Sequence, residues 1–102
     1  MVPPKVVTAI ETVEALVGET VKFFCKAKGS PEPKLTWFKD DKPILRGENS
    51  RCAITNNNLI SGDSRSSLVI VDVTLEDDGT YACEAVNEAG TDRCKAELFV
   101  DG

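Results

Sequence analysis

Two cysteines, a tryptophan and a tyrosine stand at spacings that constrain the fold of this chain more than any other feature. Trp37 follows Cys25 by 12 residues, and Tyr81 precedes Cys83 by two. Cys25, Trp37 and Cys83 fall on inward positions of predicted strands. This spacing is expected when an indole packs on a bridge between two sheets and a tyrosine hydroxyl closes a backbone turn. The pattern therefore predicts two stacked layers of strands.

Apolar residues recur at every second position in six short segments, which is the period of half-buried strands. Clusters of Gly, Pro, Asn and Asp separate these segments. Residues 11–17 also fit a short amphipathic helix, but their neighbours and the turn at Gly18 favour an edge strand of the first sheet. We therefore predict an all-β, two-sheet antiparallel sandwich. The alternating positions are Val21, Phe23, Cys25 and Ala27; Leu35 and Trp37; Cys52 and Ile54; Leu68 and Ile70; Tyr81, Cys83 and Ala85; and Cys94, Ala96, Leu98 and Val100.

Length and charge exclude several classes of protein. A chain of 102 residues with 41% hydrophobic and 28% charged content predicts one domain over residues 1–102, with an ordered core from about residue 4 to residue 101. The formal net charge of -5 argues against nucleic acid and anionic lipid as partners. No apolar run approaches the roughly 18 residues that a membrane helix requires. We expect other proteins as partners.

The sequence shows no recognisable catalytic or metal-binding pattern. The chain contains no histidine, which removes the commonest general base and a common zinc ligand. The pairs Asp40-Asp41 and Asp77-Asp78 lie in predicted turns and lack the spaced oxygen ligands of a calcium loop. We therefore expect no catalytic, cofactor-binding or metal-binding residues and no enzymatic activity in this chain, although a parent protein with a kinase domain elsewhere is compatible with this expectation.

The motif around the second cysteine resembles the immunoglobulin superfamily, and more narrowly its intermediate set (I-set), over almost the whole chain. Residues 77–83 read DDGTYAC, and residues 87–90 read NEAG. The phrases at residues 3–5 and 37–44 are similar to domains of intracellular muscle proteins of the titin, twitchin, obscurin and myosin light chain kinase kind. Similar phrases occur in adhesion molecules and receptors. The residues that carry the structural pattern are Cys25, Trp37, Leu68, Asp77, Gly79, Tyr81 and Cys83.

The resemblance implies an immunoglobulin-like sandwich that serves as a non-catalytic structural and protein-interaction module of a larger muscle or cytoskeletal protein. The alternative is an extracellular adhesion or receptor domain. Neighbouring immunoglobulin or fibronectin-type domains and sarcomeric or cytoskeletal proteins are the implied partners. Arg51 stands where the superfamily often places an arginine that pairs with the aspartate matching Asp77. We expect that ion pair; the alternative is a solvated arginine.

The same resemblance implies that Cys25 and Cys83 face each other across the core. It places Cys52 on an edge strand of one sheet and Cys94 near the opposite edge of the other. Because a disulfide requires α-carbons within about 7 Å, Cys52 and Cys94 are expected to remain thiols, either packed or acting as redox sensors. Two free thiols favour a reducing cytoplasmic, cytoskeletal or sarcomeric location over an extracellular one.

Two surfaces are candidate protein-binding sites. Leu59 and Ile60 lie in a polar segment that is longer than the family usually has, so they form either a contact site or a hairpin tip that folds back. Outward positions on the sheet with the last strands form the second candidate, for which the alternative is an ordinary solvated face. These outward residues are Phe38, Ala82, Glu84, Lys95 and Phe99.

The expected topology also suggests a mechanical role. In a seven-stranded sandwich of this kind, the first and last strands run in the same direction, and the two termini emerge at opposite ends. Force on the termini would then load the hydrogen bonds between the first and last strands in shear. A linker in a series of domains is therefore the expected use of such a module.

Overall fold

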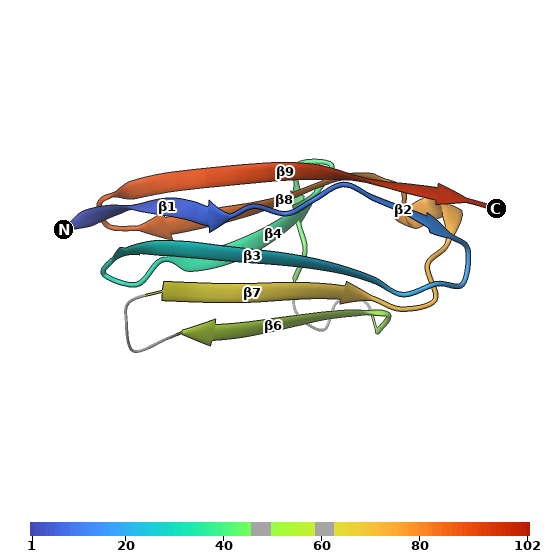
Figure 1. The fold of residues 1–102 in the computed structure, drawn as a ribbon, viewed down its shortest axis with the longest axis horizontal. Helices are drawn as coiled ribbons and strands as arrows, with labels where there is room; N and C mark the ends of the chain where they lie inside the picture. The colour runs from blue at the N-terminus through green and yellow to red at the C-terminus, as the bar shows by residue number, and fades with distance from the viewer. Residues whose placement is uncertain (46–49, 59–62) are drawn as a thin grey trace.

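The computed structural model describes residues 1–45, 50–58 and 63–102, which form two stacked β-sheets (Figure 1). One sheet has the order β1-β3-β7-β6, and the other has the order β2-β9-β8-β4-β5. The predicted all-β sandwich is confirmed, and each of the six alternating segments is a strand. The elements are β1 (Val2–Thr8), β2 (Val13–Leu16), β3 (Val21–Ser30), β4 (Lys34–Lys39), β5 (Lys42–Pro43), β6 (Cys52–Asn58), β7 (Asp63–Ile70), the 3-10 turn η1 (Leu75–Asp77), β8 (Gly79–Asn87) and β9 (Gly90–Asp101).

The chain before β3 forms two strands, one in each sheet. β1 pairs antiparallel with β3, whereas β2 pairs parallel with β9. The strand predicted within residues 11–17 is therefore present, but it belongs to the sheet of the last strands instead of the first sheet. Between β1 and β2 the chain crosses from one sheet to the other, and Ile10 is buried at this crossing. The termini lie at opposite ends of a molecule that measures 46 × 20 × 20 Å (Figure 1).

Inward side chains of both sheets form one core. The rings of Phe23 and Tyr81 stack with their centroids 5.0 Å apart, which joins β3 of one sheet to β8 of the other. Trp37 and Leu68 are buried in the same cluster, as predicted. Because inward and outward residues alternate on each strand, the core fixes which side chains reach each outer face.

The turn between β4 and β5 explains why Gly79 is a glycine. Asp40 and Asp41 both have positive φ, at 50° and 66°, which is the conformation of a tight two-residue hairpin. The Asp40 carboxylate accepts a hydrogen bond from the Thr80 amide at 3.0 Å. A Cβ at Gly79, whose φ is +155°, would lie 2.9 Å from that carboxylate. The start of β8 is thus held close to the β4–β5 turn.

Candidate functional site

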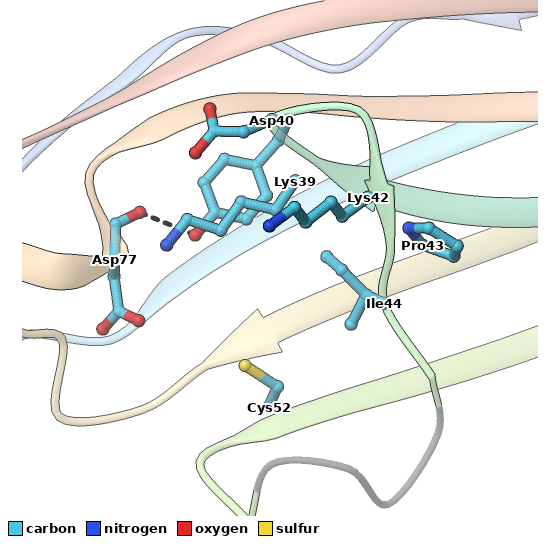
Figure 2. Close-up of a pocket in the computed structure, with 8 residues that line it drawn as sticks. Lys39, Asp40, Lys42, Pro43, Ile44, Cys52 and Asp77 are labelled. Atoms are coloured by element: carbon cyan, nitrogen blue, oxygen red, sulfur yellow. Dashed lines mark hydrogen bonds between the residues drawn. The ribbon is translucent and has the colours of Figure 1, made fainter.

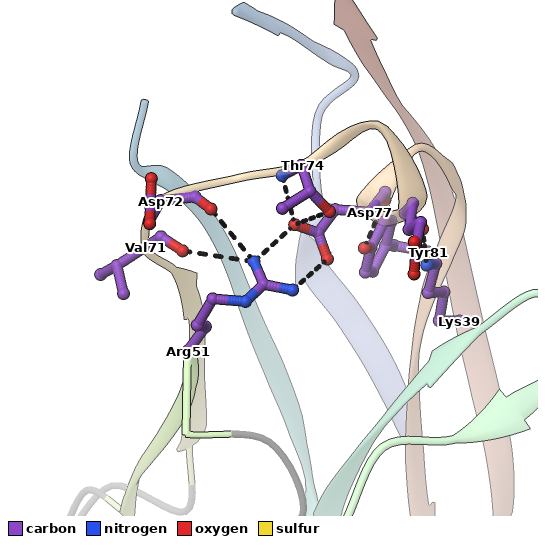
Figure 3. A network of polar contacts seen from close by, with 8 residues as sticks. Lys39, Arg51, Val71, Asp72, Thr74, Asp77 and Tyr81 are labelled. Atoms are coloured by element: carbon purple, nitrogen blue, oxygen red, sulfur yellow. Dashed lines mark hydrogen bonds and ion pairs between the residues drawn. The ribbon is translucent and has the colours of Figure 1, made fainter. Parts of the chain in front are cut away.

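Arg51 and Asp77 form the ion pair that was expected from the sequence. Arg51 lies directly before β6, and its guanidinium donates to both carboxylate oxygens of Asp77, at 2.7 and 3.2 Å (Figure 3). It also donates to the carbonyl oxygen of Asp72 at 3.2 Å. Bidentate pairing of this kind fixes direction as well as distance. It joins the beginning of β6 to the segment that leads into β8.

Two further bonds complete this group, which we call the polar corner: Arg51, Thr74, Asp77 and Tyr81. The Thr74 amide donates to the Asp77 carboxylate at 2.8 Å, and the Tyr81 hydroxyl donates to the Asp77 carbonyl at 2.6 Å (Figure 3). The second bond is the predicted tyrosine corner. Both carboxylate oxygens and the carbonyl oxygen of Asp77 therefore accept hydrogen bonds, which hold the corner in one geometry.

Burial and hydrogen bonding act in opposite directions on Asp77. Burial raises the pKa of its carboxyl group, but the bonds from Arg51 and Thr74 favour the ionised form, and the pKa lies below its ordinary value. Burial also raises the pKa of the Tyr81 hydroxyl. Both groups therefore keep their hydrogen-bonding form at neutral pH, the aspartate ionised and the tyrosine protonated.

A cavity of about 370 Å³ opens beside the polar corner (Figure 2). The ammonium groups of Lys39 and Lys42 lie over it, and the thiol of Cys52 lies on another side. The Lys39 ammonium donates to the carbonyl of Glu76. Burial raises the pKa of Cys52, so its thiol is a poor nucleophile at neutral pH. The lining residues are Lys39, Asp40, Lys42, Pro43, Ile44, Cys52, Asp77 and Tyr81.

The described residues contain no group of three or more His, Cys, Asp or Glu side chains that could hold a metal ion. No helix within the described ranges is long and apolar enough to cross a bilayer.

Three cysteines and the tryptophan meet at the middle of the sandwich, and we call Cys25, Trp37, Cys83 and Cys94 the sulphur centre. The Sγ atoms of Cys25 and Cys94 lie 3.9 Å apart. Cys94 is directly opposite Cys83 in the β8–β9 register, and its Sγ lies 3.7 Å from the Cys83 carbonyl oxygen. Cys94 lies one strand from the edge of its sheet, as expected, but its contact with the central cysteines was not foreseen. All four cysteines of the chain are thiols in this structure.

The surroundings of the sulphur centre raise the pKa of two of its thiols, Cys25 and Cys94. Contact with the Cys83 thiol and burial raise the pKa of Cys25 to about 12, although contact with Cys94 acts in the opposite direction. Contact with Cys25 and burial raise the pKa of Cys94. Trp37 lies on β4 opposite Cys83, and its indole N–H donates to the hydroxyl of buried Ser66 at 2.7 Å. The centre is thus a closely packed group whose indole has a hydrogen-bond partner.

The outward residues expected on the second sheet do share one face, with one addition and one correction. The guanidinium of Arg93, which the sequence reasoning missed, lies 4.8 Å from the centre of the Phe38 ring and 3.9 Å from Glu84. The cross-strand register of β8 and β9 would have revealed it, because Glu84 and Arg93 are partners. Ala82 is only 2% exposed, since larger neighbours surround it, whereas Phe99 is 46% exposed.

The other candidate surface lies between β6 and β7. Leu59 and Ile60 lie outside the described residues. The strands that flank them, β6 and β7, pair in an unbroken antiparallel register from Cys52 and Ile70 to Asn58 and Ser64.

A two-sheet sandwich with a tyrosine corner and a core tryptophan beside paired cysteines defines an immunoglobulin-type domain. The family model described as "Immunoglobulin I-set domain" matches residues 4–100, and the chain belongs to this family.

Relatives and solved structures agree with this assignment. "Leucine-rich repeats and immunoglobulin-like domains protein 1" of Homo sapiens is 38% identical over 97 residues, which cover 95% of this chain and 8% of that protein. Telokin of Meleagris gallopavo is 33% identical over 100 residues, covering 98% and 61% respectively. The titin M3 domain matches with a TM-score of 0.82 and 30% identity, covering 100% of both chains. The chain therefore spans less than two thirds of these two curated relatives.

Proposed function

We propose that this domain is a non-catalytic structural and protein-interaction module of a multi-domain intracellular muscle or cytoskeletal protein. The parallel pairing of β2 with β9 is the observation that carries the proposal. It joins β2, the second strand of the chain, to the last strand, β9, over four consecutive residue pairs, from Val13 and Leu98 to Leu16 and Asp101. Because the termini lie at opposite ends (Figure 1), a pull along the long axis shears this pairing instead of opening it one bond at a time.

The direction of each amide along β2 shows which substitutions should weaken its pairing with β9. The Val17 amide donates to the Asp101 carbonyl at 2.9 Å, whereas the Leu16 amide donates to the Glu19 side chain at 2.6 Å. Alternate residues of an edge strand point their amides in opposite directions. The amides of Ala15 and Val17 are therefore directed at β9, and that of Glu14 is directed away from it.

The cysteines and relatives support the proposed compartment. Cys94 packs in the core, and Cys52 lies half-buried on the edge strand β6. Neither has a disulfide partner, and such thiols persist most readily in a reducing compartment. Similar domains occur in smooth muscle myosin light chain kinase and in a growth factor receptor. An extracellular receptor or adhesion domain is therefore the alternative.

Single-molecule pulling of a tandem array tests the load-bearing part of the proposal. Ala15→Pro removes an amide directed at β9, and Glu14→Pro places the same residue one position earlier, where the amide points away. We expect the first substitution to lower the unfolding force clearly and the second to leave it near the parent value. Equal forces for all three arrays would contradict the proposal.

Counting free thiols in the protein isolated from its native source tests the compartment. Four reactive thiols per unfolded chain are expected for the intracellular module. A chain with a Cys25–Cys83 disulfide and two thiols would favour the extracellular alternative.

A further inference from the structure

The outer face of the four-stranded sheet carries a concentration of positive charge. Its outward positions hold five cations, on β1, β3 and β7, and one acidic side chain, Asp63, which pairs with Lys26 at 3.4 Å. The whole chain has a net charge of -5, so this face is opposite in sign to the rest of the molecule. We call it the basic face: Lys5, Lys22, Lys26, Lys28 and Arg65.

Pairing within the sheet places like charges directly opposite each other at two positions of the basic face. Lys26 is the register partner of Arg65, and Lys5 is the partner of Lys28. Like charges directly opposite on neighbouring strands are destabilising. On the outer face of the other sheet, the partners Glu84 and Arg93 have opposite charges. Stability alone would favour the second arrangement, so the first points to another use of these cations.

The cations follow a regular spacing along β3. The outward positions of β3 are taken in turn by Lys22, Phe24, Lys26 and Lys28. Half-buried Phe24 therefore lies between the first two lysines. Outward side chains of a strand recur about every 7 Å, which is also the period of an extended peptide. Beside this row, on β7, lie Val69 opposite Lys22 and Arg65 opposite Lys26. The face thus offers charge, an apolar contact and charge again in a line.

We propose that the basic face binds an extended acidic segment of a partner protein, laid along β3 with its carboxylates on the cations and an apolar side chain on Phe24. The choice of a protein as the partner rests on the proposed function. Nucleic acid and anionic membranes also carry negative charge. Both extend well beyond one sheet face, however, and the acidic remainder of the chain repels them. A short acidic peptide meets only the basic face.

Fluorescence anisotropy with a labelled peptide tests the proposal. The probe has the sequence Glu-Ser-Leu-Ser-Glu-Ser-Glu, and its counterpart has glutamine in place of each glutamate. The test variant is Lys28→Gln/Arg65→Gln, and the matched control is Lys34→Gln/Lys42→Gln, which removes the same charge at exposed positions elsewhere. Losing two exposed ion pairs together weakens binding by about fivefold. We expect this loss for the test variant only, together with weaker binding by the parent at higher salt.

Thermal unfolding shows whether the test variant remains folded, so that weaker binding can be assigned to the lost charges. The test variant relieves both like-charge pairs, so it is expected to unfold at the same temperature as the parent or a higher one. Equal weakening in both variants, or equal affinity for the glutamine peptide, would overturn the proposal. Tighter binding of duplex DNA or of phosphatidylserine vesicles than of the peptide would overturn it as well. The pulling experiment on β2 is unaffected by these outcomes, so the two proposals fail separately.

Discussion

The polar corner and the sulphur centre both join the two sheets, but they do so by different means. The corner lies near the C-terminal end and uses directional bonds, with a bidentate Arg51–Asp77 pair and a tyrosine hydroxyl on a single carbonyl. The centre uses volume: Trp37 and three cysteine side chains fill the space between the layers, with one indole hydrogen bond. In the corner, geometry is fixed bond by bond, whereas in the centre it is fixed by close packing.

Substitutions in the two regions should therefore act differently. Asp78, next to the corner, accepts a hydrogen bond from the Val100 amide at 2.9 Å, and Val100 is the register partner of Ala15 in β2. Losing a bond to the Asp77 carboxylate should depend on charge and pH. Losing volume in the centre should depend on neither.

Trp37→Phe should have the largest effect, because it removes packed volume and leaves the buried Ser66 hydroxyl without its donor. We expect the free energy of unfolding to fall by about 3 kcal/mol, measured by urea denaturation. The double variant Trp37→Phe/Ser66→Ala should recover part of this loss, since the unpaired hydroxyl is gone. A smaller loss of unfolding free energy than for Asp77→Asn would show that packing in the sulphur centre stabilises the fold less than the bonds of the polar corner do.

Asp77→Asn should rank second, with a loss of about 2 kcal/mol at neutral pH, because Arg51 and Thr74 lose an ionised acceptor. The pKa of Asp77 is lowered in the folded protein. Its ionised form therefore stabilises the fold above the ordinary aspartate pKa, and this contribution disappears as the pH falls through the lowered value. The difference between parent and variant should shrink in that acidic range. A difference that is constant with pH would rule out the ion pair as its cause.

Tyr81→Phe isolates the single bond of the corner that involves no charge. It removes the hydroxyl that donates to the Asp77 carbonyl and keeps the ring that stacks on Phe23. The expected loss is about 1.5 kcal/mol and independent of pH between 4 and 8. Denaturation at several pH values within this range measures both quantities, and a pH-dependent loss would tie the hydroxyl to the ion pair.

Cys94→Ala should have the smallest effect of the four, about 1 kcal/mol, because one sulphur atom is removed from contact with Cys25 and the neighbouring chain relaxes in part. Cys52→Ala is the matched control at the half-buried edge of the other sheet. We expect a smaller loss for the control in the same denaturation experiment. Equal losses would indicate that Cys94 contributes no more to packing than an edge residue.

The sequence predicted the polar corner well because its members are close together in the chain. Asp77 and Tyr81 form one short motif, Arg51 was placed from the resemblance, and Thr74 was not foreseen. The position of Cys94 depends on a longer chain of reasoning. A two-residue turn pairs Asn87 with Gly90, and counting back from that turn puts Cys94 opposite Cys83.

Other features depend on register that the sequence does not display. The placement of β2 beside β9 arises from its neighbours, because alternation alone does not say with which strand it pairs. The alternation of Lys22, Phe24, Lys26 and Lys28 is visible in the sequence. Arg65 and Lys5 join this row only through pairing with β3.

Amide hydrogen exchange along β2 is a direct test of its parallel pairing with β9. We predict slow exchange for the amides of Ala15 and Val17, which are directed at β9, and fast exchange for that of Glu14, the residue before Ala15. Fast exchange at all three positions, or protection of Glu14 with exposure of Ala15, would contradict it.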